Sequence, residues 1–312
     1  MRTEATRVIY EAALKNKNII FITGDLGHTF SKKYQENIPN QYINVGLAEQ
    51  NMVGIAAGLA LSGKKVFTFS IIPFALMRCF EQIRIDICYQ NLDVTVIGIG
   101  AGFAYSTSGC THYGTEDIAI MRALPNMKVY SPCHPPESRL IAEKILKTGG
   151  PAYLRLGKGK ETVISGLEKE TLEDIERGQG VVVIPGTDIT IFATGHIITE
   201  AISAAQELKK HGLSVEVVNI HTIKPFDNDI VLDRIGNKKA IFSLEEHSIY
   251  GGLGSAISEI ISEANFHVKP PIFKRFGIKD RFTSVVGSIE TLRKDNGIDT
   301  ESIVKEIFNL ML

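Results

Sequence analysis

The chain has 312 residues, of which 44% are hydrophobic, and a formal net charge of −1. This length is generous for one hydrophobic core and comfortable for two domains. The balanced charge gives no reason to expect nucleic acid or an anionic membrane as a partner. No apolar run is long enough to cross a bilayer.

Cysteine usage and the N-terminal residues indicate a reducing compartment. The four cysteines form no CxxC pair and no cluster with the spacing of metal ligands. The first residues predict a charged amphipathic helix and not a signal peptide. We therefore expect a cytoplasmic protein with reduced thiols at Cys79, Cys88, Cys110 and Cys133.

Short β-branched runs alternate with helical patterns in the first half of the chain. Runs this continuously apolar are typical of strands buried on both faces, so we expect a mostly parallel sheet covered by helices on each side. The predicted strands are 18–24, 65–70, 93–99, 127–132 and 151–156, and the predicted helices are 3–15, 47–62, 74–88, 115–123 and 136–147.

A charged, glycine-containing stretch interrupts this rhythm before a second series of strands. We expect a first domain at 1–160, a linker at 161–179 and a smaller α/β domain at 180–312. In the second domain the predicted strands are 181–185, 188–195, 214–220, 239–247 and 271–277, and the predicted helices are 198–211, 252–265 and 300–310.

Glu49 is the most informative single residue, because it opens a helix with no charged side chain from Met52 to Leu61. A helix that is apolar on all sides is buried, and Gly54 and Gly58 would let another backbone approach closely. A carboxylate entering such surroundings must be paired or carry a raised pKa. This favours a proton-transfer group, with a helix cap or an interface ion pair as the alternative.

These residues lie in a stretch with a recognisable pattern. The segment GLAEQNMVGIAAGLALSGKKVFTFSIIPF resembles the pyrimidine-binding domain of transketolases and 1-deoxyxylulose-5-phosphate synthases, which use thiamine diphosphate. The resemblance continues through GCTHYGTEDIAIMRALPNMKVYSP, GTDITIFATG, TIKPFD and EEHSIYGGLGS, in the right order and over nearly the whole chain. It implies two three-layer α/β/α domains, a pyrimidine-binding domain followed by a transketolase C-terminal-like domain.

The resemblance implies roles for several residues toward the cofactor. Glu49 matches the acid that bonds the pyrimidine nitrogen opposite the amino group and drives the ring to its imino tautomer, which takes the proton from the thiazolium carbon. Phe74 matches the aromatic ring that stacks on the pyrimidine. Asp25 matches an acidic position that approaches the cofactor. Ile71 and Met77 stand where transketolases often carry further aromatics, so the pocket stays apolar but changes shape.

Other positions imply contacts with the substrate. His112 matches a histidine that faces the substrate and helps bind or protonate its oxygens, which suits a group that titrates near neutral pH. His28 lies where the family places substrate-facing polar groups. Ser108 replaces the aspartate with which transketolases usually recognise a substrate hydroxyl, and a neutral hydroxyl cannot replace that acceptor one for one.

Phosphate recognition departs from the family pattern. Residues 97–105, IGIGAGFAY, offer no cation where the family has phosphate-binding His or Arg. Lys158 and Arg155 lie near the family's other phosphate-reading position, and one of them could meet an anion. A sugar nucleotide or an unphosphorylated aldehyde is therefore a hypothesis for the acceptor beside the usual sugar phosphate.

The second domain carries a titratable group of residues, His221, Glu245, Glu246 and His247, whose spacing matches no metal motif. The following glycine-rich segment, 251–255, lacks both the phosphate-loop ending and the dinucleotide pattern. We expect it to be a tight turn from strand to helix.

The diphosphate-binding half of a transketolase is missing from this sequence. That domain holds the diphosphate through Mg²⁺ with a Gly-Asp-Gly motif and a later Asn, an oxygen-rich cage that suits a divalent ion. Here the only Gly-Asp is Gly24-Asp25, and it is followed by Leu26. We therefore expect a separate N-terminal subunit that holds the diphosphate and the metal, with two copies of each chain in an α2β2 assembly. The helix around 80–89 is a candidate dimer face.

These observations together predict the C-terminal subunit of a split transketolase. It would transfer a two-carbon ketol unit from a ketose to an aldehyde, with sugars or sugar phosphates as substrates, and would be inactive without its partner. The alternatives are a pyruvate-using subunit like 1-deoxyxylulose-5-phosphate synthase, a 2-oxo acid dehydrogenase beta subunit, and a non-catalytic scaffold.

Overall fold

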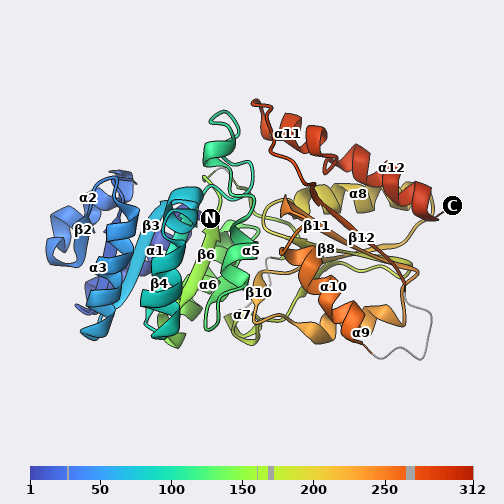
Figure 1. The fold of residues 1–312 in the computed structure, drawn as a ribbon. Helices are drawn as coiled ribbons and strands as arrows, with labels where there is room; N and C mark the ends of the chain where they lie inside the picture. Colours follow the sequence, from blue (N-terminus) through green and yellow to red (C-terminus); the bar gives the residue numbers. More distant parts are fainter. Residues whose placement is uncertain (27, 160, 168–171, 265–270, 312) are drawn as a thin grey trace.

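The computed structural model describes residues 1–26, 28–159, 161–167, 172–264 and 271–311. Two α/β domains lie side by side, each with a central sheet between two layers of helices (Figure 1). In the described part of the chain, no helix is both long and apolar enough to span a membrane. The cysteines are free thiols, and Cys110 alone among them is exposed.

The first sheet has the strand order β10-β5-β6-β4-β3-β1-β2. All its pairings are parallel except that of β10 with β5, which is antiparallel. Because β10 comes from the second half of the chain, the first sheet is completed by a strand that follows the predicted linker. The strands are β1 (Ile19–Thr23), β2 (Tyr42–Asn44), β3 (Lys65–Ile71), β4 (Val94–Ile99), β5 (Lys128–Tyr130), β6 (Ala152–Leu156) and β10 (Thr222–Lys224).

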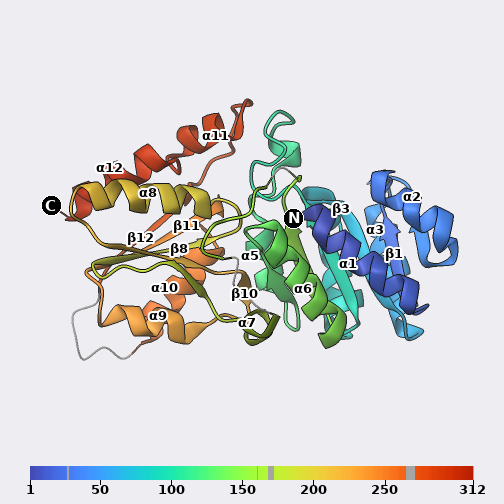
Figure 2. The same ribbon diagram turned by 180° about the vertical axis from the view of Figure 1, so that it is seen from behind.

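Helices cover both faces of this sheet, as the apolar strands require. Helices α1 and α6 lie together on one face, which Figure 2 shows in front, and α3 and α5 lie on the other. The elements are α1 (Arg2–Lys15), α2 (His28–Asn37), η1 (Pro39–Gln41), α3 (Glu49–Leu61), η2 (Pro73–Met77), α4 (Phe80–Gln82), η3 (Ile83–Tyr89), η4 (Cys110–His112), α5 (Asp117–Arg122) and α6 (Pro135–Thr148).

The helix predicted at 74–88 is divided into three pieces. Elements η2 and η3 are π-helical turns on either side of the single α-helical turn α4. Pro73 stands at the start of η2, where its fixed φ and missing N–H are tolerated. A π-turn is wider than an α-turn and often occurs at functional sites, but the apolar pattern of the sequence is too coarse to distinguish the two.

Helix α3 buries one face and not all sides, so the prediction of a fully buried helix is wrong for the single chain. Met52, Val53 and Ala56 pack in the core, whereas Leu47 just before the helix is 78% exposed and Leu61 at its end is 63% exposed. The exposed positions of the helix are polar at Gln50 and Asn51 and small or apolar farther along, at Gly54, Gly58 and Leu61. At Gly54 and Gly58 an added Cβ would meet nothing within 4 Å.

The second sheet has the order β12-β11-β8-β9-β7 and is parallel except for the pair β7 and β9. Helices α8 and α12 cover one face, and α9 and α10 cover the other (Figures 1 and 2). The elements are β7 (Val181–Ile184), β8 (Ile189–Thr194), α8 (Ile198–Lys210), β9 (Val215–Asn219), α9 (Asn228–Ile235), β11 (Ala240–Ser248), α10 (Leu253–Glu263), β12 (Ile272–Ile278), α11 (Ile289–Asn296) and α12 (Thr300–Met311).

The two domains are joined by buried contacts as well as by the chain. One apolar cluster contains Val53 and Met121 from the first domain together with Val231 and Leu253 from the second. Within the predicted linker, helix α7 (Leu172–Arg177) places Ile175 in the core of the first domain.

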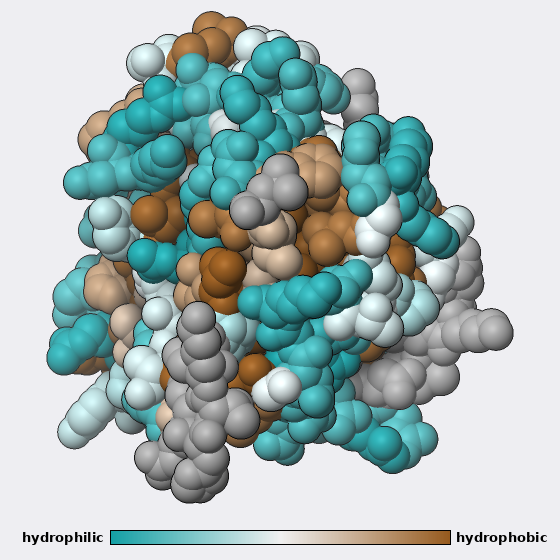
Figure 3. Space-filling model, turned by 90° about the vertical axis from the view of Figure 1, so that its right-hand side faces the viewer, coloured by the Kyte–Doolittle hydropathy of each residue, from teal (hydrophilic) through white to brown (hydrophobic). Residues whose placement is uncertain are grey.

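Seen from the side of the second domain, apolar residues gather at the centre of the face and hydrophilic residues surround them (Figure 3).

Candidate active site

Most of the residues predicted for the site come together at the carboxyl ends of the parallel strands of the first sheet. Asp25 follows β1, Ile71 ends β3, and Lys158 follows β6. Helix α3 begins at Glu49 beside the same edge, and the 100–116 loop between β4 and α5 carries His112. Ligands of open α/β sheets bind at this edge, because the loops that leave the strands converge there.

The carboxylate of Glu49 is buried and paired. The residue is 1% exposed, its Oε1 accepts a hydrogen bond from the Ser70 hydroxyl at 2.9 Å, and its Oε2 accepts one from Arg78 Nη1 at 2.7 Å. An added Cβ on Gly24 would lie 3.3 Å from the Glu49 side chain, so the Glu49 carboxylate packs closely against the backbone of this glycine. Of the two states that the sequence allowed, the structure therefore shows the paired one.

Arg78 joins Glu49 to Phe74 and was not predicted. Its guanidinium carbon lies 4.6 Å from the centre of the Phe74 ring, a cation–π contact, and its side chain is 45% exposed. The wide turn of η2 carries Phe74, and Arg78 follows directly after it. Because a buried carboxylate such as Glu49 needs a cation, the arginine four residues after Phe74 could have been predicted as its partner from the sequence.

His112 lies edge-on to Phe74 and beside Tyr105. The ring centres of His112 and Phe74 are 5.2 Å apart, those of His112 and Tyr105 are 5.8 Å apart, and Lys158 Nζ lies 4.5 Å from the centre of the Tyr105 ring. The Nδ1 of His112 lies 2.9 Å from the hydroxyl of Thr111. The site residues therefore form one continuous row, from Glu49 through Arg78, Phe74, His112 and Tyr105 to Lys158.

Tyr105 is a second residue that sequence reasoning missed. Burial raises the pKa of its phenol, so the ring is a neutral platform between the imidazole and the ammonium group. Its position within a glycine-rich segment gave no periodic signal.

The remaining predicted residues lie around this row. Asp25 is exposed, with its backbone N–H donating to Asn44 Oδ1 at 3.1 Å and its carboxylate accepting from Asn44 Nδ2 at 2.9 Å. Ile71 is buried, whereas Ser108 is exposed on the 100–116 loop. His28 begins α2, and its side chain lies outside the described part of the chain.

Arg155 does not fit its predicted role as a reader of a substrate anion. The side chain is 2% exposed, and its guanidinium donates to Asp117 at 2.8 Å and to the carbonyl oxygens of Gly114 and Glu246 at 2.8 and 3.1 Å. These partners occupy the guanidinium and exclude solvent. Arg155 is a structural residue, and the spacing of the sequence could not show that Asp117 would fold against it.

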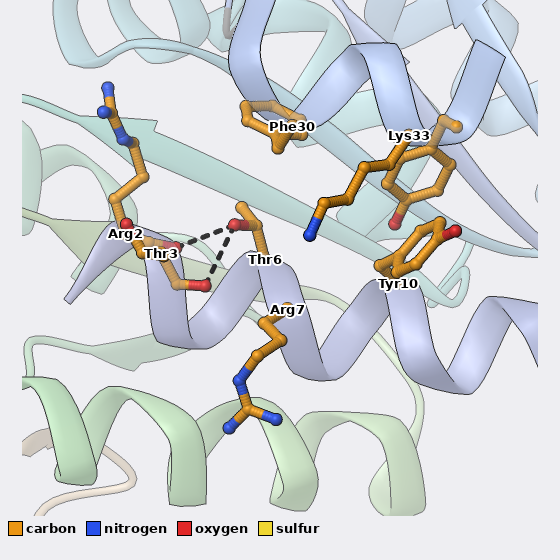
Figure 4. Close-up of a pocket in the computed structure, with 8 residues that line it drawn as sticks. Arg2, Thr3, Thr6, Arg7, Tyr10, Phe30 and Lys33 are labelled. Atoms are coloured by element: carbon orange, nitrogen blue, oxygen red, sulfur yellow. Dashed lines mark hydrogen bonds between the residues drawn. The ribbon is translucent and has the colours of Figure 1, made fainter. Parts of the chain in front are cut away.

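A separate cavity of about 220 Å³ lies between α1 and α2. Lys33 and Phe30 of α2 extend toward Thr6 and Tyr10 of α1, while Arg7 points away to the other side of its helix (Figure 4). Arg7 is paired there with Glu4 and Glu11 at 2.8 Å. None of the residues in the row from Glu49 to Lys158 lines this cavity.

Comparison with known proteins identifies the family. The family described as "Transketolase, pyrimidine binding domain" matches residues 1–162, and "Transketolase, C-terminal domain" matches residues 178–303. This chain belongs to the transketolase family. The predicted family and the two α/β domains with mostly parallel sheets are thereby confirmed.

Individual relatives agree with this assignment to the transketolase family. The chain is 37% identical over its whole length to a "Putative transketolase C-terminal section" of Methanocaldococcus jannaschii, covering 96% of that protein. It is 38% identical to an apulose-4-phosphate transketolase subunit of Actinobacillus succinogenes, over 86% of this chain and 84% of that one. Among solved structures, "Split gene transketolase, inactive beta4 tetramer" matches 99% of this chain and 96% of that chain with a TM-score of 0.84 and 33% identity.

The residues of this transketolase chain fit the pyrimidine end of thiamine diphosphate. A buried carboxylate and a half-buried aromatic ring, linked here through Arg78, supply the hydrogen-bonding group and the flat apolar surface that such a heterocycle needs. Among the described residues, no three His, Cys, Asp or Glu side chains could hold a metal ion together. The group of acids and histidines in the second domain thus supplies no metal site within that part of the chain.

In the second domain of the transketolase chain, Glu245 caps a helix. Its carboxylate accepts hydrogen bonds from the backbone N–H groups of Leu253 and Gly254 at 2.7 and 2.9 Å, at the start of α10. Burial raises the pKa of Glu245 to about 7 and lowers the pKa of the neighbouring His247. Gly251 and Gly252 complete the predicted turn from strand to helix, and residues 253–255 begin α10.

Proposed function

We propose that this chain is the C-terminal subunit of a two-chain, thiamine-diphosphate-dependent transketolase. It would transfer a two-carbon ketol unit from a ketose donor to an aldehyde acceptor. The observation that carries the proposal is the buried carboxylate of Glu49 at the carboxyl edge of the sheet, which Arg78 joins to Phe74, with His112 edge-on to Phe74. The names of its relatives, a C-terminal section and a transketolase subunit, support a partner chain.

The chain's own residues would bind the pyrimidine and manage protons. Glu49 would share a proton with the ring nitrogen, and the Ser70 hydroxyl would fix the orientation of its Oε1. Phe74 would support the flat face of the ring, with Ile71 and Asp25 beside it. When bound, thiamine diphosphate supplies the carbon atom that carries the two-carbon unit.

The other half of the row would meet the substrate. His112 would hold or move a proton at a substrate oxygen, and Lys158 would attract an anionic end of the sugar. Ser108 and His28 complete the proposed substrate contacts. We propose sugars or sugar phosphates as substrates.

The partner subunit would hold the diphosphate and Mg²⁺, and two copies of each chain would form the assembly. The exposed face of α3, with Gly54 and Gly58 open to solvent, supports a contact with another chain there. The isolated chain is then expected to be inactive, which agrees with the solved split-gene relative that is described as an "inactive beta4 tetramer".

The test is product analysis after the chain is mixed with a purified partner subunit, thiamine diphosphate and Mg²⁺. A ketose phosphate and an aldehyde should give a ketol-transfer product, and pyruvate with the same aldehyde should not. Glu49→Gln keeps the hydrogen bond to Ser70 but removes the acid, and should lower kcat by about 10³-fold, within the range of losses for removed acid–base groups. Near-parental activity of this variant would favour the scaffold alternative, and a product from pyruvate would favour the synthase-like one.

A further inference from the structure

The C-terminal domain holds the far side of the 100–116 loop, whose near side carries Tyr105 and His112. Phe103 and Tyr113 belong to the same buried apolar cluster as Ile197 of the second domain, and their rings are 5.2 Å apart. Phe103 stands two residues before Tyr105, and Tyr113 directly follows His112. Each residue that faces the site therefore has an anchor in the second domain.

Glu246 of β11 supplies the polar part of this anchor. Its Oε2 accepts a hydrogen bond from the backbone N–H of Phe103 at 3.2 Å, and its Oε1 accepts one from Arg293 Nε at 2.7 Å. Arg293 in turn donates to Glu200 Oε1 at 2.9 Å, and Glu200 Oε2 accepts from the backbone N–H of Thr300 at 2.9 Å. Helices α8, α11 and α12 thus fix the carboxylate that meets the loop.

The loop is shaped to receive this carboxylate. Gly102 has a φ of +56°, and an added Cβ there would lie 2.2 Å from Glu246 Oε2. Gly102 and Gly114 exchange two backbone hydrogen bonds, at 2.9 and 3.1 Å, which close the base of the loop. The close approach of Glu246 to Phe103 therefore requires glycine at position 102.

We propose that Glu246, held by Arg293, is a positioning residue that sets the place of His112 and Tyr105 relative to Phe74. The proposal rests on the proposed function, in which His112 faces the substrate. Glu246→Gln leaves one oxygen for two donors. The charged Arg293 holds that oxygen more strongly than the Phe103 N–H does, so the buried N–H loses its acceptor and the loop relaxes to find another. Because these residues are proposed to face the substrate, a displaced loop should weaken substrate binding, and a misplacement of about 1 Å can cost on the order of 100-fold in rate.

The test compares Glu246→Gln with a matched control, Glu216→Gln. Glu216 is also a buried carboxylate of the second domain, paired with Arg234 at 3.0 Å and Thr190 at 2.8 Å, and both partners lie in that domain. Two measurements are made: amide hydrogen exchange of residues 103–116 in the isolated chain, and KM and kcat of the chain with its partner subunit, thiamine diphosphate and Mg²⁺. Gly102→Ala disturbs the same contact from the loop side and serves if Glu246→Gln fails to fold.

Glu246→Gln should speed exchange of the loop amides by about tenfold and raise KM for the sugar by about tenfold, which corresponds to about 1.4 kcal/mol. The affinity for thiamine diphosphate should stay within about twofold, and Glu216→Gln should change neither the loop amides nor KM. Parental exchange in Glu246→Gln, or a loosened loop with parental KM, overturns the proposal. If the parent chain with its partner transfers no ketol unit, the proposed function fails, and hydrogen exchange alone then decides whether Glu246 holds the loop.

Discussion

Arg78 neutralises the Glu49 carboxylate from the solvent side, so the charge of this site depends on a pair and not on a lone acid. The pair joins a nearly inaccessible oxygen to a half-exposed guanidinium. Solvent screens such a pair partly, so its contribution lies below that of a fully buried ion pair. A ligand that approaches Glu49 must either displace the guanidinium or share the carboxylate with it.

Arg78→Met should therefore lower the free energy of unfolding by about 1–2 kcal/mol, because it leaves a buried carboxylate without its cation. Urea unfolding of the isolated chain measures this loss. Adding Arg78→Met to Glu49→Gln should cost much less than it does in the parent, since the charge that Arg78 neutralises is already gone. Equal losses in both backgrounds would show that the pair contributes nothing to stability.

Glu245 makes the stability depend on pH. Burial raises its pKa in the folded chain to about 7 from an ordinary 4.5, against two backbone hydrogen bonds that favour the charged form. The stability that it contributes is thus full below pH 4.5 and is lost as the pH rises through about 7, by at most about 1.4 kcal/mol per pH unit. The lowered pKa of His247 acts in the opposite direction, since its contribution is lost as the pH falls below 6.5.

Glu245→Gln should isolate the contribution of the carboxylate. Between pH 4.5 and 7 the difference in unfolding free energy between parent and variant should shift by up to about 3 kcal/mol, in favour of the variant at the higher pH. Urea midpoints measured every half pH unit give this curve. A difference that stays constant with pH would mean that Glu245 keeps its ordinary pKa.

Among the secondary-structure elements, the sequence predicts the strands and helices that have a long apolar pattern. Strands such as β3 and β8 consist mainly of apolar and β-branched residues, and their burial agrees with that composition. Strand β10 has three residues and no such pattern, so its place in the first sheet could not be predicted. The π-turn of η2 could not be predicted either, because its hydrogen bonds span only one residue more than those of an α-helix and the apolar pattern does not resolve that difference.

The site residues that belong to a sequence motif were predicted. Those that reach the site only through folding were missed. Glu49, Phe74 and His112 carry motif signals and lie in one row. Tyr105 belongs to the site only through its contacts with His112 and Lys158 in the folded chain. Arg155 was misassigned because its partner Asp117 is 38 residues away in the sequence.

Helix α3 offers a test of assembly that leaves the single chain intact. Gly58 lies in the exposed face with open space around it, so Gly58→Ala should stabilise the isolated chain by about 0.5–1 kcal/mol through helix propensity. Gly58→Leu should also fold, but its bulk should weaken association by at least about tenfold if another backbone packs there. Sedimentation of both variants, with and without the partner subunit, measures this, and parental association of the leucine variant would move the interface elsewhere.

At the scale of the whole molecule, the two domains are coupled and should unfold together. Arg155 is buried in the first domain, and it bonds Asp117 there and the Glu246 carbonyl of the second domain. Strand β10 and the shared apolar cluster add further contacts across the boundary. The chain is therefore expected to behave as one cooperative unit and not as two independent domains.

Arg155→Met should destabilise the whole chain by about 3–5 kcal/mol, because it removes the cation that pairs with the buried Asp117 carboxylate. Hydrogen exchange should show the loss in the slowest amides of both sheets, since global unfolding exposes both at once. Arg234→Met breaks an ion pair within the second domain, and in a cooperative chain it should likewise lower the protection of the slowest amides in both sheets. A loss confined to the first sheet in Arg155→Met would contradict the coupling, since each domain would then open on its own.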